Sequence, residues 1–384
     1  MALRARTRRT GRRKSNARKV WGMYTYIAGD NDLTDYALLD ITEMEEAGGT
    51  QDRHVAVQVD TAGVHDGSVR YEIGEPDFEG HSHRTVIARL PEQNTGDPKY
   101  LASFASWSAS RYPAKNRLLV VWNHGAGFMH EPTRDIGYDD SSGNDALTMG
   151  ELRWALEKAG FGKKLGKLSI LGFDACLMNM LEVAYEFTGI TDLVVGSQQT
   201  EPGDGWPYGD VVGCLRRTTS PLAAASEIVA SYLAHYRKVG TSGVTQSSID
   251  VAALDGVGNA VDKLATELLN AMDTSRNLIT EARVKTQGYE EPTYVDMVDL
   301  MEHLAKKVRN PKVRTACAAV VKSVRKAVCA NGFYGRSVGR SCGLSIWFPL
   351  LKTDYVSRRN EYMALRYTRD YGNWAEFLDR LLAA

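Results

Sequence analysis

Two short apolar runs in this sequence end abruptly in side chains that can do chemistry. Residues 118–122 lead into Asn123, His124 and Gly125, and residues 168–173 lead into Asp174, Ala175 and Cys176. Strands buried on both faces of a parallel sheet read as continuous apolar runs, and functional groups lie just beyond their carboxyl ends. If the two strands are neighbours, a thiol and an imidazole meet at one sheet edge. That pairing is typical of a cysteine nucleophile with a histidine base.

Each of these residues alone also has a plainer interpretation. An isolated cysteine usually packs as a small apolar side chain, and His124 could be a ligand, a base or an ordinary loop residue. The pair together favours catalysis. Gly125 lacks a Cβ, so its backbone can approach a substrate closely, and the N–H groups of Gly125 and Cys176 could donate to an oxyanion. Because residues 177–187 have helical periodicity, we expect Cys176 at a helix N-terminus, whose dipole favours the thiolate.

Alternating strands and helices are expected to position this pair. The patterns predict strands at 20–27, 55–60, 118–122, 168–173, 193–197 and 245–254, a hairpin at 69–73 and 83–90, and helices over 30–47, 97–111, 177–187 and 221–239. A further helix begins at Thr148, which forms a capping box with Glu151. Asp30 and Asp32 close the first strand and could face the same sheet edge, although helix capping explains them adequately.

The pattern changes after residue 255. Helical periodicity dominates to about residue 330, a β pattern returns at 343–349, and a closing helix lies near 374–382. We therefore predict an α/β sandwich with a mostly parallel sheet over residues 20–254. A mostly helical region over 255–384 packs on it, and residues 1–19 form a disordered basic tail.

The composition indicates a folded, soluble protein with a sizeable core. Hydrophobic residues make up 43% of the 384 positions, and no apolar run reaches the roughly 18 residues of a membrane span. Five cysteines without a close pair argue against a disulfide framework or a zinc site, so a reducing compartment is expected. Residues 1–19 hold nine Lys and Arg and no acid, whereas the whole chain is neutral. This tail lacks the features of an ordinary signal peptide, so the localisation stays open, with the cytoplasm as the default.

Four motifs, taken in order, resemble the clostripain family of cysteine peptidases. They are Asn123-His124-Gly125, Asp174-Ala175-Cys176-Leu177-Met178, the loop EPGDGWPY at 201–208 and the β run GLSIWFP at 343–349. The resemblance spans most of the chain from residue 20 onwards. Because this family shares the caspase-like fold with gingipains, legumains and caspases, the resemblance implies a three-layer αβα sandwich.

The resemblance also implies a His–Cys dyad that cleaves peptide bonds after a basic residue, Arg and possibly Lys, with no cofactor in the chemistry. Cys176 would be the nucleophile and His124 the acid and base; no third member is implied. Asp174 matches the family position that lines the specificity pocket, where a carboxylate would pair with a substrate guanidinium. The alternative is that Asp174 caps the following helix. Asp204 is the second candidate pocket acid, although Asp210 could take that role.

Control of the activity is a separate expectation from the resemblance. Members are often made as inactive zymogens that cleave themselves between the His and Cys segments, or they need calcium. The loop at 129–144 lies between those segments and holds Arg134 as the candidate autocleavage site, with Lys163, Lys164 and the basic tail as further candidates. Four acidic residues of this region could bind calcium, a hard cation that prefers carboxylates: Asp135, Asp139, Asp140 and Asp145. Their spacing is not that of an EF-hand, and a solvated acidic loop is the alternative.

Two functions of other classes remain open. An inactive caspase-like scaffold that binds protein partners would normally lose the nucleophile or the base, and both are present here. The basic tail could bind nucleic acid in a salt-dependent, sequence-independent way, but no aromatic residues interleave with its charges. We expect protein or peptide substrates, with no membrane partner and no nucleic-acid partner.

Overall fold

A nine-stranded sheet forms the centre of the molecule. The computed structural model describes residues 18–63, 67–75, 84–131 and 135–383. Within them the strand order is β10-β8-β7-β6-β5-β1-β2-β3-β4. The strands are β1 (Lys19–Gly29), β2 (Arg53–Thr61), β3 (Val69–Ile73), β4 (Arg84–Arg89), β5 (Ala114–Trp122), β6 (Leu168–Asp174), β7 (Thr191–Gly196), β8 (Val244–Asp250) and β10 (Val328–Tyr334). The five central strands run parallel, and the strands at both edges pair antiparallel.

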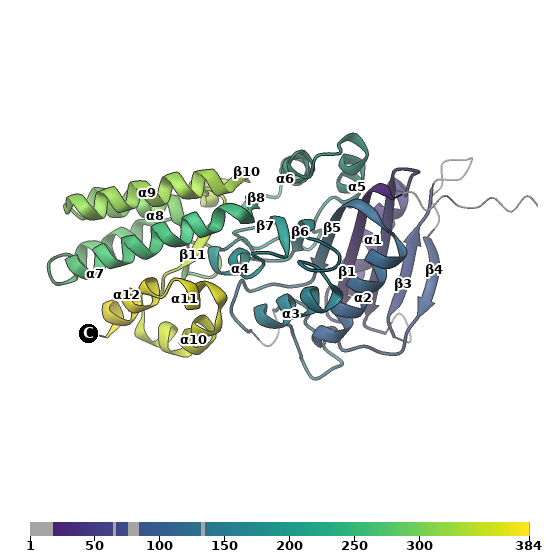
Figure 1. Ribbon diagram of the computed structural model, residues 1–384, viewed down its shortest axis with the longest axis horizontal. Coiled ribbons are helices and arrows are strands. Elements are labelled where there is room, and N and C mark those ends of the chain that lie inside the picture. Colours follow the sequence, from purple (N-terminus) through teal and green to yellow (C-terminus); the bar gives the residue numbers. More distant parts are fainter. Residues whose placement is uncertain (1–17, 64–66, 76–83, 132–134, 384) are drawn as a thin grey trace, which may run out of the picture.

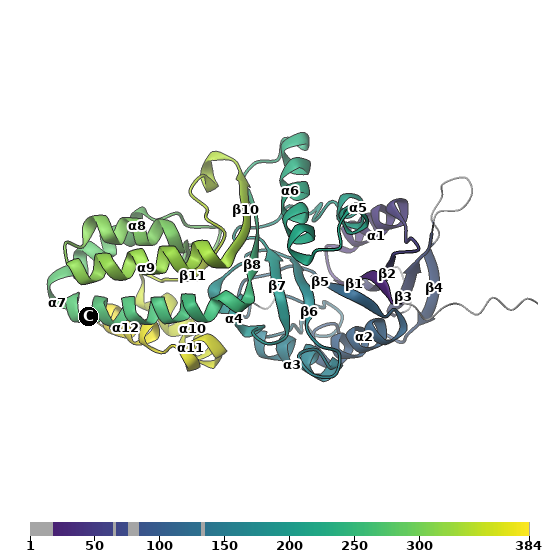
Figure 2. The ribbon, with the colours of Figure 1, turned by 45° about the horizontal axis from the view of Figure 1, so that its top comes forward.

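Helices cover both faces of this sheet, as Figures 1 and 2 show. One face packs against α2 (Pro98–Arg111), α3 (Met149–Ala159) and α4 (Leu181–Glu186), and the other against α1 (Thr34–Ala47), α5 (Tyr208–Arg217) and α6 (Pro221–Val239). Side chains of β1 alternate between the two faces: Tyr24 and Tyr26 belong to the first core, and Met23 and Ile27 to the second. Burial on both faces explains why the central strands read as continuous apolar runs. The predicted three-layer αβα sandwich with a mostly parallel sheet is confirmed.

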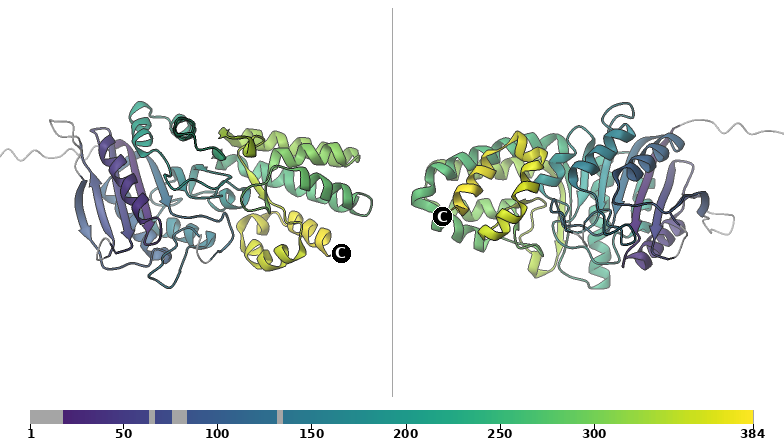
Figure 3. Two further views of the ribbon diagram at one scale, coloured as in Figure 1. Left: turned by 180° about the vertical axis from the view of Figure 1, so that it is seen from behind. Right: turned by 90° about the horizontal axis from the view of Figure 1, so that it is seen from below.

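The C-terminal part forms a helical lobe at the β10 end of the sheet (Figures 1 and 3). It contains α7 (Leu254–Lys285), α8 (Met297–Lys307), α9 (Pro311–Ala327), α10 (Lys352–Ala364), α11 (Arg366–Asp370), α12 (Asn373–Leu382) and a small sheet of β9 (Tyr294–Asp296) and β11 (Ser345–Trp347). The apolar core under α2, α3 and α4 continues into these helices, and β10 pairs with β8. The boundary at residue 254 stays a prediction, and the two parts share one sheet and one core.

Three predicted boundaries are wrong. The helix expected from residue 177 begins only at Leu181, because the chain first passes through a turn in which Leu177 has a φ of 66°. The first helix begins at Thr34 rather than near residue 30. The helical pattern expected to about residue 330 ends earlier, because residues 328–334 form the edge strand β10. The middle of this strand, Ala330, Asn331 and Gly332, is small or polar, and such residues are depleted in strands.

Among the described residues, no helix combines the length and the apolar character that a membrane crossing needs. All but two residues of the predicted basic tail, 1–19, lie outside the described residues.

Candidate active site

The ends of β5 and β6 bring His124 and Cys176 to one sheet edge. The two strands are parallel neighbours, and their register places Trp122 opposite Asp174. His124 and Cys176 each follow their strand by two residues, so they lie at the same level beyond the sheet. Both line the same two cavities. The prediction that the two strands are neighbours is confirmed.

The backbone around Gly125 lies against the backbone of Cys176. A Cβ added at Gly125 would lie 2.5 Å from the carbonyl oxygen and 3.0 Å from the nitrogen of Cys176. Only glycine allows this approach, which a real Cβ would prevent. The two backbone segments thus lie close enough together for both to contact one substrate carbonyl, and the oxyanion hole stays a prediction.

Cys176 does not lie at a helix N-terminus, contrary to the sequence prediction. Leu177 N–H donates to the carbonyl of Gln199 at 3.2 Å, and α4 starts five residues after the thiol. The helix dipole therefore gives no account of its reactivity. Instead the sulfur contacts the backbone of Glu201: the Glu201 N–H donates to Cys176 Sγ at 3.3 Å, and the thiol donates to the Glu201 carbonyl at 3.9 Å.

His124 has a carboxylate partner that the sequence reasoning assigned elsewhere. Its Nε2 lies 2.8 Å from Asp32 Oδ1, and the side chain of Asp32 is 79% exposed. The capping interpretation of Asp30 and Asp32 is wrong, because α1 starts after Leu33 and shows no side-chain cap. Asn123 Nδ2 donates to the carbonyls of Ala28 and Tyr138 and fixes the loop that carries His124. The ring of Tyr138 packs edge-on against the imidazole, with centroids 6.4 Å apart.

A cavity of about 130 Å³ opens beside the thiol and the imidazole. Its wall includes Asp174, Glu201 and the glycines at 203 and 205. Asp174 is buried, and its Oδ2 accepts from Tyr208 Oη at 2.8 Å and Trp206 N at 3.2 Å. Asp174 caps no helix, since α4 begins at Leu181 with Met180 at its N-cap. Asp174 thus lines a pocket next to Cys176.

Glu201 is the residue of this pocket that the sequence reasoning missed as an acid. It lines both cavities beside Cys176, and its Oε1 accepts from Gln246 Nε2 at 3.2 Å. Burial raises the pKa of Glu201 well above its usual range, and the nearby carboxylate of Asp174 adds to the rise. Burial also raises the pKa of Asp174. Two adjacent buried carboxylates repel each other when both are ionised, so the pair retains a proton. A cationic side chain bound between them would stabilise the ionised forms of both.

The other candidate acids lie elsewhere. Asp204 and Asp210 are exposed, and neither lines the 130 Å³ cavity. Arg134 lies outside the described residues. Lys163 and Lys164 are exposed in the turn after α3.

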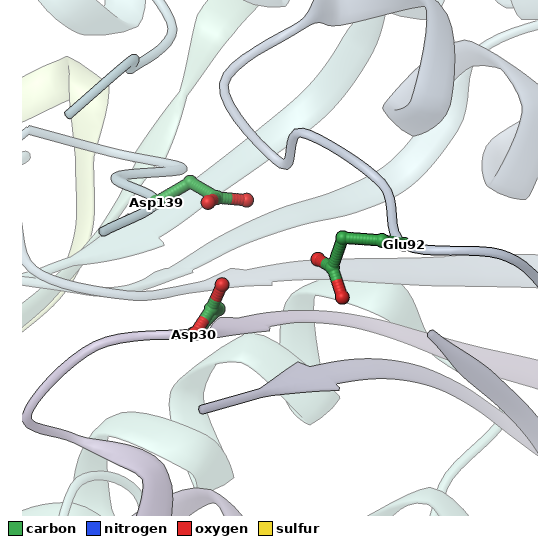
Figure 4. Close-up of side chains that lie close together, drawn as sticks. All are labelled: Asp30, Glu92 and Asp139. Atoms are coloured by element: carbon green, nitrogen blue, oxygen red, sulfur yellow. The ribbon is translucent and has the colours of Figure 1, made fainter. Parts of the chain in front are cut away.

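The structure separates the four acidic residues considered for calcium. Asp135 pairs with His130 at 2.5 Å, the Tyr138 hydroxyl donates to Asp140, and Asp145 accepts from Asn94 at 2.6 Å. Asp139 alone is fully buried, and it lies with Asp30 and Glu92 (Figure 4).

A second, larger cavity forms an open cleft beside His124 and Cys176. It measures about 930 Å³, and its wall includes His124, Gly125 and Cys176. Four glutamates also line it, Glu131, Glu201, Glu290 and Glu291. The cleft therefore carries acidic side chains along its wall.

Comparison with known proteins agrees with this geometry. The sequence model of the clostripain family matches residues 25–382. Clostripain from Hathewaya histolytica is 30% identical over 234 residues, which make up 52% of this chain and 42% of that protein. The chain therefore matches less than half the length of this relative.

Two solved structures share the fold. A secreted C11 cysteine protease from Bacteroides thetaiotaomicron, in complex with an irreversible peptide inhibitor, is 23% identical with a TM-score of 0.73, covering 93% of this chain and 99% of that one. An inactive zymogen C11 protease from Parabacteroides distasonis is 19% identical with a TM-score of 0.73, covering 92% and 99%. These likenesses confirm the caspase-like fold. Because the family match spans almost all of the described residues, the chain belongs to the clostripain family of cysteine peptidases.

Proposed function

We propose that this protein is a cysteine endopeptidase that cleaves peptide bonds after basic residues, with Cys176 as nucleophile and His124 as acid and base. The observation that carries the proposal is the position of the two side chains. They follow neighbouring parallel strands at the same level and open on one acidic pocket. Membership of a cysteine peptidase family supports the same chemistry.

The residues supply each step of an acyl transfer. The Cys176 thiolate attacks the substrate carbonyl carbon, and the Gly125 and Cys176 N–H groups donate to the developing oxyanion. The C–N bond breaks as His124 gives its proton to the leaving amine, which leaves a thioester on Cys176. His124 then takes a proton from water, the resulting hydroxide attacks the thioester, and the C–S bond breaks to return the thiolate.

Asp32 positions His124 for these proton transfers. Its carboxylate engages Nε2 at 2.8 Å, which leaves Nδ1 to exchange protons with the reacting atoms. A carboxylate in this place also stabilises the imidazolium that forms during the reaction. Asp32 acts through His124 and is therefore a positioning residue.

Specificity for a basic residue comes from the paired carboxyls of Asp174 and Glu201. A guanidinium that enters the 130 Å³ pocket replaces their shared proton and forms charge-assisted hydrogen bonds, bidentate in the best case. We infer a preference for Arg over Lys, because only the guanidinium presents a planar fork to two acceptors. Asp204 lies outside this pocket wall and has the smaller role.

We also propose that the chain is made as a zymogen and cleaves itself in the loop at 129–144, with Arg134 as the site. Support comes from the position of the loop, which begins at the wall of the cleft: Met129 and Glu131 line it. A structural neighbour is described as an inactive zymogen.

A panel of fluorogenic peptides ending in Arg, Lys, Asp or Asn tests the proposed function. We expect the parent chain to cleave the Arg peptide fastest and the Asp and Asn peptides not at all, and Cys176→Ala to be inactive. Cys329→Ala is the matched control, because this half-buried cysteine lies on β10, three strands away from β6. Activity that survives in Cys176→Ala, or cleavage after Asp or Asn, would contradict the proposal. Gel analysis of the same samples shows whether a cut between residues 129 and 144 depends on Cys176.

A further inference from the structure

The helical lobe reaches the loop that carries His124. The hydroxyl of Tyr294, the first residue of β9, donates to the carbonyl oxygen of Ala126 at 2.6 Å, and this bond is buried. The phenol ring also lies against Gly127, because a Cβ added there would lie 2.7 Å from Tyr294 Cε2 and 2.8 Å from its Oη. The loop therefore turns directly over a side chain that lies 168 positions beyond Ala126 in the sequence.

The sequence of this loop leaves its backbone free to adopt many conformations. Gly125, Ala126 and Gly127 follow His124, and glycine restricts φ and ψ least of all residues. Gly127 uses this freedom, with a φ of 68°. Because a buried carbonyl without a donor costs free energy, the bond from Tyr294 favours the loop conformation in which the Ala126 carbonyl meets the phenol.

The phenol of Tyr294 is held rigidly. β9 pairs with β11, where Tyr294 lies opposite Trp347, and Figure 1 shows β11 next to α4. The ring of Phe128 packs on both, with centroids 6.0 Å from Tyr294 and 5.4 Å from Trp347. Phe348 N–H donates to the carbonyl of Thr293 at 2.7 Å. Burial raises the pKa of Tyr294 well above its usual range, so the hydroxyl keeps its proton and stays a donor.

The same segment of the lobe also contacts the loop beside Cys176. Glu290 N–H donates to Gln199 Oε1 at 2.9 Å, and Gln198 Nε2 donates to Asp296 Oδ2 at 3.1 Å. The lobe therefore touches both of the loops that lie beside the thiol and the imidazole.

We propose that Tyr294 is a positioning residue for catalysis. By holding the Ala126 carbonyl, its hydroxyl fixes the loop that presents the His124 imidazole and the Gly125 N–H to the substrate. Donors fixed before the reaction stabilise the developing charge without reorganising. Tyr294 is fully buried, so it acts through the loop rather than on the substrate. This role rests on the proposed function, in which Gly125 donates to the oxyanion.

Tyr294→Phe removes the hydroxyl and keeps the ring. We expect kcat for an Arg peptide to fall about 10- to 100-fold, because small displacements of reacting groups are costly, whereas KM should change less than about twofold. Tyr355→Phe is the matched control. The Tyr355 hydroxyl donates to the carbonyl of Ala375 at 3.3 Å, a buried bond of the same kind between α10 and α12 of the lobe. Its loss should leave kcat unchanged.

A peptidyl-Arg aldehyde separates positioning from a general loss of stability. Cys176 Sγ bonds to the aldehyde carbon, and the thiol proton moves to the carbonyl oxygen, which takes the place of the oxyanion in a hemithioacetal. The inhibition constant of the aldehyde should rise in Tyr294→Phe by about the same factor as kcat falls. The affinity for the corresponding alcohol, which forms no bond with the thiol, should stay unchanged. All measurements are made at a temperature at which thermal melting shows each variant to be folded.

Equal kcat and equal aldehyde inhibition in Tyr294→Phe and its parent would overturn the role of Tyr294. An equal loss in Tyr355→Phe would also overturn it, because the lobe would then act through stability alone. If Tyr294→Phe does not fold, Gly127→Ala disturbs the same contact from the loop side. It should show the same loss of kcat, and an unchanged kcat would overturn the role. A parent chain that cleaves no Arg peptide would contradict the proposed function, and with it the role of Tyr294.

Discussion

At the scale of single residues, the contact between Asp32 and His124 decides, in the mechanism we propose, which imidazole nitrogen serves the thiol. Because Nε2 is engaged by Asp32 at 2.8 Å, the proposed mechanism assigns proton transfer to Nδ1. The carboxylate of Asp32 is 79% exposed, and exposed pairs of this kind contribute little to the free energy of unfolding. We therefore assign Asp32 a role in orienting the His124 imidazole rather than in stabilising the fold.

Asp32→Asn is expected to lower kcat by about tenfold while leaving KM unchanged. The loss is smaller than the 10²- to 10⁴-fold that general acid–base catalysis supplies, because His124 remains in place with its orientation less restricted. Asp32→Glu should recover part of the rate. Steady-state kinetics on an Arg peptide measure both constants, with Asp35→Asn, an exposed acid in the first turn of α1, as the control. A rise in KM without a fall in kcat would argue for a role in substrate binding instead.

The buried acids predict a pH dependence of specificity. Burial raises the pKa of Asp174 to about 6, so the pocket loses negative charge as the pH falls from about 7 to about 5, above the range of ordinary carboxyls near 4. We expect kcat/KM for Arg peptides to fall in that window. Asp174→Asn and Glu201→Gln should each lower it by about 10- to 100-fold at neutral pH, since hydrogen bonds to charged groups contribute about 1.5–3 kcal/mol.

Asp204→Asn and Asp210→Asn are the matched controls, because both side chains are exposed and lie outside the pocket wall. An effect of Asp204→Asn as large as that of Asp174→Asn would show that the second pocket acid has been misidentified.

Asp32 and Glu201 show which site residues could not be predicted from the sequence. His124, Cys176 and Asp174 stand out because each follows an apolar run. Asp32 does not, because an aspartate between a strand and a helix fits a cap equally well. Glu201 begins a loop rich in Gly and Pro, and only the folded chain reveals that its side chain is buried against Asp174. Residues whose role depends on tertiary contact leave no local pattern.

At the scale of elements, the ends of β5 and β6 create the site, and both strands were predictable. The capping box of Thr148 and Glu151 is also confirmed, because it depends on local hydrogen bonds alone. The start of α4 was not predictable. Leu177, Met178 and Met180 are buried by tertiary packing, and their apolar pattern resembles that of a helix although they lie before it. The left-handed turn at Leu177 interrupts the chain where a helix was expected.

Gly125→Ala is expected to lower kcat by about 100-fold or more, comparable to the loss of an oxyanion donor. Its Cβ would lie 2.5 Å from the Cys176 carbonyl oxygen, so one of the two loops must move. Gly209→Ala is the control, because a Cβ at Gly209 meets nothing within 4 Å. Kinetics on the Arg peptide and a thermal melt separate the loss of rate from a loss of fold. A fully active Gly125→Ala would remove the argument for paired donors.

At the scale of the whole molecule, the sheet and the C-terminal helices depend on each other. β10 covers the edge of β8, and one apolar core extends from the sheet into the helices. We expect a chain ending at residue 254 to aggregate or to lack a cooperative unfolding transition, because it exposes both the strand edge and the apolar face. Size-exclusion chromatography and circular dichroism provide the measurement. A monomeric, cooperatively folding 1–254 chain would show that the boundary predicted from sequence separates independent domains.

Covalent labelling is the sharpest test of Cys176 as a nucleophile that acts with His124 and an Arg-selective pocket. The native chain is incubated with a peptidyl-Arg chloromethyl ketone, digested and analysed by mass spectrometry, beside His124→Ala and a matched peptidyl-Asp reagent. We expect one adduct, on Cys176. It should form with the Arg reagent, far more slowly in His124→Ala, and not with the Asp reagent. An adduct on another of the five cysteines, or labelling of Cys176 that is indifferent to His124 and to the basic residue, would contradict this role of Cys176.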